Sequence, residues 1–224
     1  MDVHRPYDVI TFDCYGTLID WERGIRDAFA AQAAAARLPV DLDAALALYV
    51  EIEAAVEAEA YRSYRAVLSE TALRIAARLG WQLPASRASF LADSLPGWPP
   101  FPDTNPALRR LDAAGYRLGI LSNVDDDLLA WSHRHLAAFF EIVVTAQQAG
   151  SYKPAPNHFT MARGRIAGQR WLHAAQSYFH DVVPARALGI PVAWINRKGE
   201  TAAGAATPDR ELRTLADLAD WLAP

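Results

Sequence analysis

The chain has 224 residues, of which 52% are hydrophobic and 21% charged, a balance typical of a folded globular protein. Its net charge of -4 gives no basic surface for nucleic acid, so we expect no nucleic-acid partner. The single cysteine, Cys14, can form no internal disulfide, and no apolar run approaches the ~20 residues of a membrane span. Residues 1–6 lack the apolar segment of a signal peptide, so we expect a soluble cytoplasmic protein without membrane association.

The first predicted element is a short buried strand, residues 9–12, that ends at Asp13. Gly16 then lets the backbone turn away. Ligands of open α/β sheets bind beyond the carboxyl ends of the strands, where Asp13 would meet a substrate. An aspartate at such a place can also simply cap a turn, and this stretch alone leaves both interpretations open.

Helical periodicity then continues for about eighty residues. Asp41 is a suitable cap for the second of these helices, and the charges of its acidic residues are most simply a solvated face. The cluster of Pro and Gly at 96–103 is typical of a domain junction. The helices are predicted over residues 22–38, 42–59, 64–79 and 86–95, with the acidic residues Glu51, Glu53, Glu57 and Glu59 in the second.

Strands and helices alternate in the rest of the chain, which predicts βαβ units and a parallel sheet. We therefore expect an α/β fold: a doubly wound, Rossmann-like core formed by residues 1–18 and 98–224, with a helical domain of residues 19–97 inserted after the first strand. Strands are predicted over residues 116–121, 141–145, 171–175 and 191–195, and helices over residues 105–114, 125–139, 157–167, 182–188 and 215–222.

Polar side chains stand at or just past the ends of the predicted strands. A lysine near a carboxylate favours its ionised form, and a fixed, ionised carboxylate can act as a nucleophile. Each residue alone has an ordinary explanation as a cap or loop residue, but their meeting at one sheet edge points to covalent catalysis. The residues are Asp13 with Thr17, Ser122 with Asn123, Lys153 and Asp181.

These segments resemble the haloacid dehalogenase superfamily, and within it the L-2-haloacid dehalogenases of type II. The resemblance implies that the helical insertion is a cap domain over the core. It also implies the hydrolysis of a short 2-haloacid by an enzyme without a cofactor. The segments that carry it are residues 12–18, 121–123, 152–154, Asp181 with 188–191, and 194–197.

The residue two positions after the nucleophile separates two reactions. In the phosphatases of the superfamily this place holds a second aspartate, which acts as general acid and base. Here it is Tyr15, whose ordinary pKa near ~10 prevents that task at neutral pH. Because halide needs no proton to depart, Tyr15 favours displacement at carbon. The alternative is a magnesium-dependent phosphatase of small phosphomonoesters, with Asp13, Asp181 and the aspartates at 125–127 as metal ligands; a third hypothesis is a weakly catalytic binding protein.

The mechanism that the resemblance implies begins with attack of Asp13 on the α-carbon and formation of an ester. Lys153 holds Asp13 ionised, while the side chains of Thr17, Ser122 and Asn123 position the nucleophile and the substrate. Water oriented by Asp181 then hydrolyses the ester, and the 2-hydroxyacid leaves with inverted configuration.

The sequence also departs from this branch around the expected pocket. The branch carries a halide-binding arginine in the cap, for which Arg62 and Arg65 are candidates, although solvent-facing arginines are the simpler interpretation. Gln176 and Tyr178 stand where the branch has serine and asparagine, and we expect both, with Tyr15 and Asn123, to bind the substrate. His180 has no counterpart: it could be a base or a substrate-binding halide contact, or simply a satisfied loop histidine. The pocket therefore has room for another leaving group, such as fluoride. The cap helices could also pack a homodimer.

Overall fold

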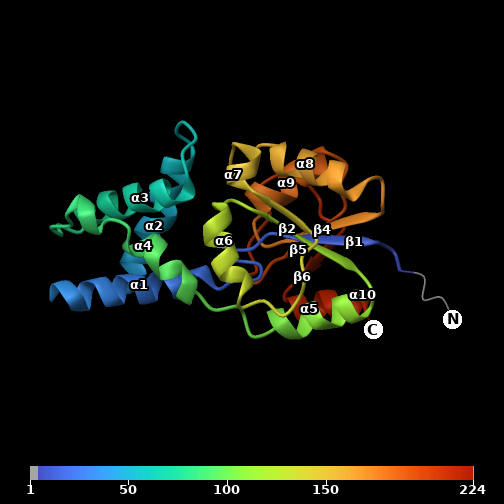
Figure 1. Ribbon diagram of the computed structural model, residues 1–224, viewed down its shortest axis with the longest axis horizontal. Coiled ribbons are helices and arrows are strands. Elements are labelled where there is room, and N and C mark those ends of the chain that lie inside the picture. Colours follow the sequence, from blue (N-terminus) through green and yellow to red (C-terminus); the bar gives the residue numbers. More distant parts are fainter. Residues whose placement is uncertain (1–4, 224) are drawn as a thin grey trace.

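The computed structural model describes residues 5–223, and within them a six-stranded parallel sheet forms the centre of the fold (Figure 1). Residues 1–4 and residue 224 lie outside the described residues. The first four belong to the segment from which we expect no signal peptide. The strand order is β3-β2-β1-β4-β5-β6. The strands are β1 Val9–Phe12, β2 Arg117–Ser122, β3 Ile142–Thr145, β4 Trp171–Ala175, β5 Val192–Ile195 and β6 Arg210–Leu212.

Strand β1 lies in the middle of the sheet, and its four apolar or β-branched residues are fully buried. It pairs with β2 on one side and β4 on the other, so chain order reverses at β1. The carboxyl ends of such neighbouring strands form the crevice in which open α/β sheets bind ligands. Asp13, the residue after β1, therefore stands at the expected place.

Helices cover both faces of the sheet, which confirms the predicted doubly wound α/β fold. In Figure 1, α5 and α10 lie on one face and α8 and α9 on the other. Leu108 and Leu218 are buried in the core on the first face, and Phe159 and Ala185 in the core on the second. The helices of this part are α5 Thr104–Ala113, α6 Asp126–His133, α7 Ala146–Ala149, α8 Asn157–Ile166, α9 Val183–Ala187 and α10 Leu215–Leu222.

The remaining helices, α1 to α4, form a separate layer beyond the carboxyl ends of the strands (Figure 1). Asp41 caps α2 as predicted, because its carboxylate accepts the amides of Asp43 and Ala44. Gly24 of α1 lets Trp98 pack against the helix, since a Cβ there would lie 2.3 Å from the indole. The helices are α1 Trp21–Ala36, α2 Leu42–Glu57, α3 Tyr64–Arg78 and α4 Phe90–Ser94.

Several element boundaries differ from the predictions. The helix expected over 125–139 ends at His133, because both ends of the Asn105 side chain hydrogen-bond the following segment, at His135 O and Ala137 N. The short elements α7 and β6 were not predicted. A wide π-type turn, Tyr178–Val182, precedes α9 and contains Asp181; such turns are frequent at functional sites.

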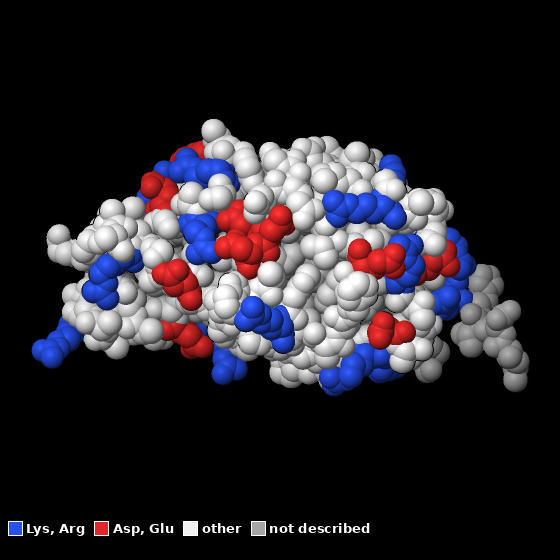
Figure 2. All heavy atoms as spheres, viewed as in Figure 1, with Lys and Arg blue, Asp and Glu red and all other residues white. Residues whose placement is uncertain are grey.

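On the face shown in Figure 2, basic side chains lie beside acidic ones in several places and do not gather into one basic patch. None of the described helices is long and apolar enough to span a bilayer.

Candidate active site

Asp13 is held in a fixed position at the carboxyl end of β1. Its backbone amide bonds Ala174 O of the neighbouring strand, and its Oδ2 accepts the Thr17 hydroxyl at 3.0 Å. Gly16 makes the turn with a φ of +96°, a left-handed conformation that favours glycine. The side chain of Asp13 is almost completely buried, yet it lies on the wall of a cavity.

Lys153 connects the two carboxylates that were predicted to be catalytic. Its Nζ donates to Asp13 Oδ1 at 2.9 Å, to Asp181 Oδ1 at 2.6 Å and to Leu121 O at 2.9 Å, which uses all three ammonium hydrogens. Asn123 fixes the lysine backbone, accepting Lys153 N at 2.7 Å and donating to Lys153 O at 3.0 Å. Asn123 therefore positions the lysine as well as lining the cavity.

The pKa values of Asp13 and Asp181 shift in opposite directions, although both carboxylates bond the same lysine. Burial would raise the pKa of Asp181, but Lys153 and His173 together lower it to about 2. Burial also raises the pKa of Asp13, and Lys153 lowers it less than burial and Asp181 raise it. Lys153 thus acts on Asp13 in the predicted direction, because it lowers the pKa of Asp13 against the rise that burial and Asp181 cause.

His173, which the sequence analysis did not single out, completes the network behind Asp181. It lies in β4 with no exposure, and its Nε2 is 2.9 Å from Asp181 Oδ1. Thr11 accepts the indole N–H of Trp171 at 2.7 Å and can donate its own hydrogen to His173 Nδ1 at 2.9 Å. This chain leaves Nε2 as the donor to Asp181 and fixes the carboxylate from behind. A histidine within an otherwise apolar strand is the signal that could have identified it.

The cavity, about 420 Å³ in volume, lies between the carboxyl end of the sheet and α2. Aromatic side chains from both parts form much of its wall: Trp21, Tyr49, Tyr64, Trp98, Tyr178 and Phe179. Gln176 and His180, two of the residues predicted to bind substrate, also line it. Glu200 and Thr201 border it from the loop after β5. Burial lowers the pKa of His180.

Tyr15 lines the cavity, but its hydroxyl is occupied. It lies 2.9 Å from Ser132 Oγ, and burial raises the pKa of Tyr15 well above its ordinary value. The phenol is therefore not poised to exchange a proton at neutral pH. Ser122 is fully buried beside the site, and its Oγ has no hydrogen-bond partner among the described residues.

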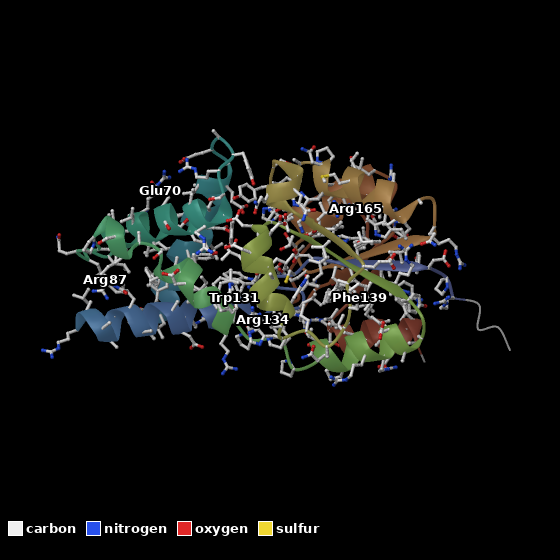
Figure 3. All side chains as sticks on the ribbon, in the orientation of Figure 1. Glu70, Arg87, Trp131, Arg134, Phe139 and Arg165 are labelled. Carbon is white, nitrogen blue, oxygen red and sulfur yellow. The ribbon has the colours of Figure 1, made fainter. Side chains whose placement is uncertain are left out.

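Arg62 does not reach the cavity. Its guanidinium pairs with Glu59 at the surface of the cap, so its predicted role in substrate binding is not supported by this placement. Arg65 pairs with Asp127 and is likewise outside, as the solvent-facing interpretation expects. Figure 3 places Arg87 at the outer end of the cap, away from the sheet.

The prediction that all four glutamates of residues 51–59 lie on a solvated face is wrong for Glu53 and Glu57. Glu51 and Glu59 are exposed and paired with arginines, as a solvated face predicts. Glu53 and Glu57, however, are half-buried and line the cavity. They follow the buried Tyr49 at intervals of four residues, so they share its face of the helix. That spacing was the available signal.

The aspartates at 125–127 do not form a metal site with Asp13. Asp125 accepts the amides of Tyr64 and Arg65 at 2.9 Å each, and so caps the start of α3. Asp126 bonds Thr145 and Gln148, and Asp127 pairs with Arg65. In residues 5–223, no three His, Cys, Asp or Glu side chains are grouped as a metal would require. The aspartates at 125–127 are thus engaged with other groups and do not join Asp13 and Asp181 in the ligand set that the alternative hypothesis expects.

Comparisons with known proteins agree with this geometry. The family of haloacid dehalogenase-like hydrolases matches residues 7–204. An (S)-2-haloacid dehalogenase of Pseudomonas putida is 30% identical over 97% of this chain and 99% of its own length. A defluorinating L-2-haloacid dehalogenase has a TM-score of 0.85 at 23% identity, covering 97% of this chain and 96% of its own. The enzyme from Xanthobacter autotrophicus with chloropropionic acid covalently bound has a TM-score of 0.81 at 21% identity, covering 96% and 97%. At these identities the two structures show a shared fold.

Proposed function

The chain belongs to the haloacid dehalogenase-like hydrolases, and from this premise we propose that it hydrolyses the carbon–halogen bond of short-chain 2-haloacids through an ester on Asp13. Its substrates are the (S)-enantiomers of chiral 2-haloacids, together with the achiral fluoroacetate. Two features of the site together carry the proposal: Asp13 is buried and bonded by Lys153, and the Tyr15 hydroxyl is hydrogen-bonded to Ser132. The first supplies a nucleophile, and the second leaves no acid–base group for phosphate transfer two residues away.

In the first step, an oxygen of Asp13 attacks the α-carbon and the halogen leaves with the bonding electrons on the opposite side. Lys153 and Thr17 keep the carboxylate oriented through Oδ1 and Oδ2. We assign Asn123, Gln176, Tyr178 and His180 to the walls that hold the substrate. Fixing both reactants in one geometry lowers the entropic part of the barrier.

In the second step, water attacks the carbonyl carbon of the ester and the 2-hydroxyacid departs. Asp181 is the remaining ionised carboxylate next to Lys153, so we assign it the orientation of this water. Its Oδ2 is buried and has no partner among the described residues, which leaves an acceptor for a water hydrogen. Ser122 is proposed to assist substrate binding with its unpaired hydroxyl.

We further propose that the α1–α4 layer, within residues 19–97, acts as the cap domain on a core of residues 1–18 and 98–224. Its α2 supplies one wall of the cavity, the start of α3 bonds Asp125 of the core, and Gly24 of α1 packs against Trp98 of the core. A homodimer and a cytoplasmic location stay predictions; the mass in solution tests the first.

The test is halide release from L-2-chloropropionate, chloroacetate and fluoroacetate, with excess EDTA and separately with magnesium, beside hydrolysis of p-nitrophenyl phosphate. We expect halide release that EDTA does not reduce, and no phosphate release. Phosphate release that requires magnesium, without halide release, would contradict the proposal and favour the phosphatase.

A further inference from the structure

The cavity carries more acidic than basic side chains. Among the described residues that line it, five are acidic and two are lysines: Asp13, Glu53, Glu57, Asp181 and Glu200 against Lys153 and Lys198. Lys153 is already shared by Asp13 and Asp181. Lys198 pairs with Glu22 outside the wall. Glu53 and Glu57 thus face a site for an anionic acid without a cation of their own.

The contacts of this pair are with neutral groups. Glu53 accepts the Tyr64 hydroxyl at 2.9 Å, and Tyr64 in turn lies 3.0 Å from the Tyr49 hydroxyl. Asn123, the residue that holds Lys153, lowers the pKa of Glu57. No ion pair to Glu53 or Glu57 occurs in the part of the chain that the structure describes.

Two carboxyl groups four residues apart on one helix face repel each other when both are ionised. Burial raises the pKa of Glu57 to about 9, and the charge of Glu53 adds to this rise. Burial likewise raises the pKa of Glu53 to about 7. The groups facing the pair are Lys153, which opposes the rise, and Tyr49, Tyr64 and Tyr152, whose own pKa values are raised, so that they stay neutral.

Asp13 and the glutamate pair line the same cavity from different parts of the fold, because Asp13 follows β1 of the sheet and Glu53 and Glu57 lie on α2. An in-line displacement by Asp13 expels the halogen on the side of the carbon away from Asp13, and we take α2 as the wall on that side. Cap arginines do not line this wall: Arg62 and Arg74 pair with Glu59, and Arg78 with Glu51. Among the described residues, Glu57 thus lines the α2 wall of the cavity without an arginine beside it.

We propose that the carboxyl group of Glu57, with Glu53 beside it on the same helix face, donates a hydrogen bond to the departing halide. This inference rests on the proposed function. As the Asp13 oxygen bonds the α-carbon, the carbon–halogen pair of electrons moves onto the halogen, and Glu57 keeps its proton while bonding the halide. Fluoride, the strongest hydrogen-bond acceptor of the halides, gains most from such a donor. Ionised, the same wall repels both the halide and the substrate carboxylate.

The experiment compares halide release by the wild type, Glu57→Ala, Glu57→Gln and the control Glu51→Gln, from about pH 6 to about pH 10. Wild-type kcat is expected to fall as pH rises through about 9, where Glu57 ionises. Glu57→Ala is expected to lose on the order of tenfold to a hundredfold in kcat, more with fluoroacetate than with chloroacetate. In Glu57→Gln the amide donates at every pH, so the alkaline loss should disappear. The exposed Glu51 pairs with Arg78, and its variant should behave as the wild type.

An alkaline loss that persists in Glu57→Gln, or a Glu57→Ala enzyme as active as Glu51→Gln, would overturn the inference. A wild type that releases no halide at all would instead overturn the proposed function. Thermal unfolding in the presence of halide tests whether Glu57 binds halide, and it does not require enzyme activity. Sodium bromide should raise the Tm of the wild type above that of Glu57→Ala at neutral pH, and equal shifts would overturn it.

The protonation itself has a separate readout in stability. The folded state holds these protons up to about pH 7 and 9, whereas an unfolded glutamate releases its proton near 4.5. Folding therefore takes up protons between these values, and stability falls as pH rises across this window. The fall should be smaller in Glu57→Gln than in the wild type, and parallel curves would contradict a protonated Glu57.

Discussion

The two walls of the cavity follow different physical rules. At the sheet, charged groups have partners: Lys153 donates to both Asp13 and Asp181, and His173 contacts Asp181 from behind. At α2, Glu53 and Glu57 have no cation, and burial raises their pKa instead. A buried carboxyl can thus be stabilised by a partner or by a proton. The first solution yields a nucleophile, and the second yields a hydrogen-bond donor.

The largest effect is expected from removing the pairing at the sheet. Lys153→Met leaves Asp13 and Asp181 buried together, so the pKa of Asp13 rises further above its ordinary range. Each unit of pKa above the assay pH costs about tenfold in ionised nucleophile, and we expect a loss of at least ~10²-fold in kcat at neutral pH. Because the lost form is the ionised one, activity should recover partly as pH rises.

The control for this variant is Lys198→Met, which removes the same charge at the mouth of the cavity. The Lys198 side chain is 52% exposed, so its loss should cost far less. Equal losses in the two variants would mean that Lys153 acts only through the net charge of the cavity.

An intermediate effect is expected behind Asp181. His173→Gln weakens the positioning of Asp181, which orients the hydrolytic water in the proposed mechanism. Ester hydrolysis should therefore slow by up to ~10²-fold, while ester formation changes little. Rapid quenching and mass spectrometry of the peptide that carries Asp13 should then show accumulated ester. A variant that slows both steps equally would indicate a structural role of His173 alone.

The smallest effect is expected where the cap meets the core. Asp125→Ala removes the acceptor for the amides of Tyr64 and Arg65 and should lower the free energy of unfolding by about 1 kcal/mol. Asp127→Ala removes only a surface pair with Arg65 and should cost less, about 0–1 kcal/mol. Urea unfolding measures both, and the reverse order would contradict the capping role of Asp125.

The sheet side of the site could be predicted because strand ends are set by local sequence. An apolar run, a polar residue and a glycine locate Asp13, and the parallel sheet brings Asn123 and Asp181 to the same edge. His173 was harder to predict, because its partners lie on other segments: Thr11 on β1 and Asp181 after β4.

The cap side could not be predicted in the same way. The side of a helix that faces a cavity depends on how the helix docks, and charge alone favours the solvated interpretation. Glu53 and Glu57 differ from Glu51 only in sharing the face of Tyr49. The end of α6 at His133 also depended on a distant contact, the side chain of Asn105.

The central claim is that Asp13 forms the ester, and oxygen isotopes test it most directly. A single turnover of L-2-chloropropionate in ¹⁸O-water, with enzyme in excess and EDTA present, should give unlabelled lactate and one ¹⁸O in the peptide that carries Asp13. This follows because the product oxygen comes from the Asp13 carboxylate and water attacks the carbonyl carbon of the ester. Asp13→Asn should show neither turnover nor label. Labelled lactate from an unlabelled Asp13 would contradict the account, since water would then have attacked the substrate itself.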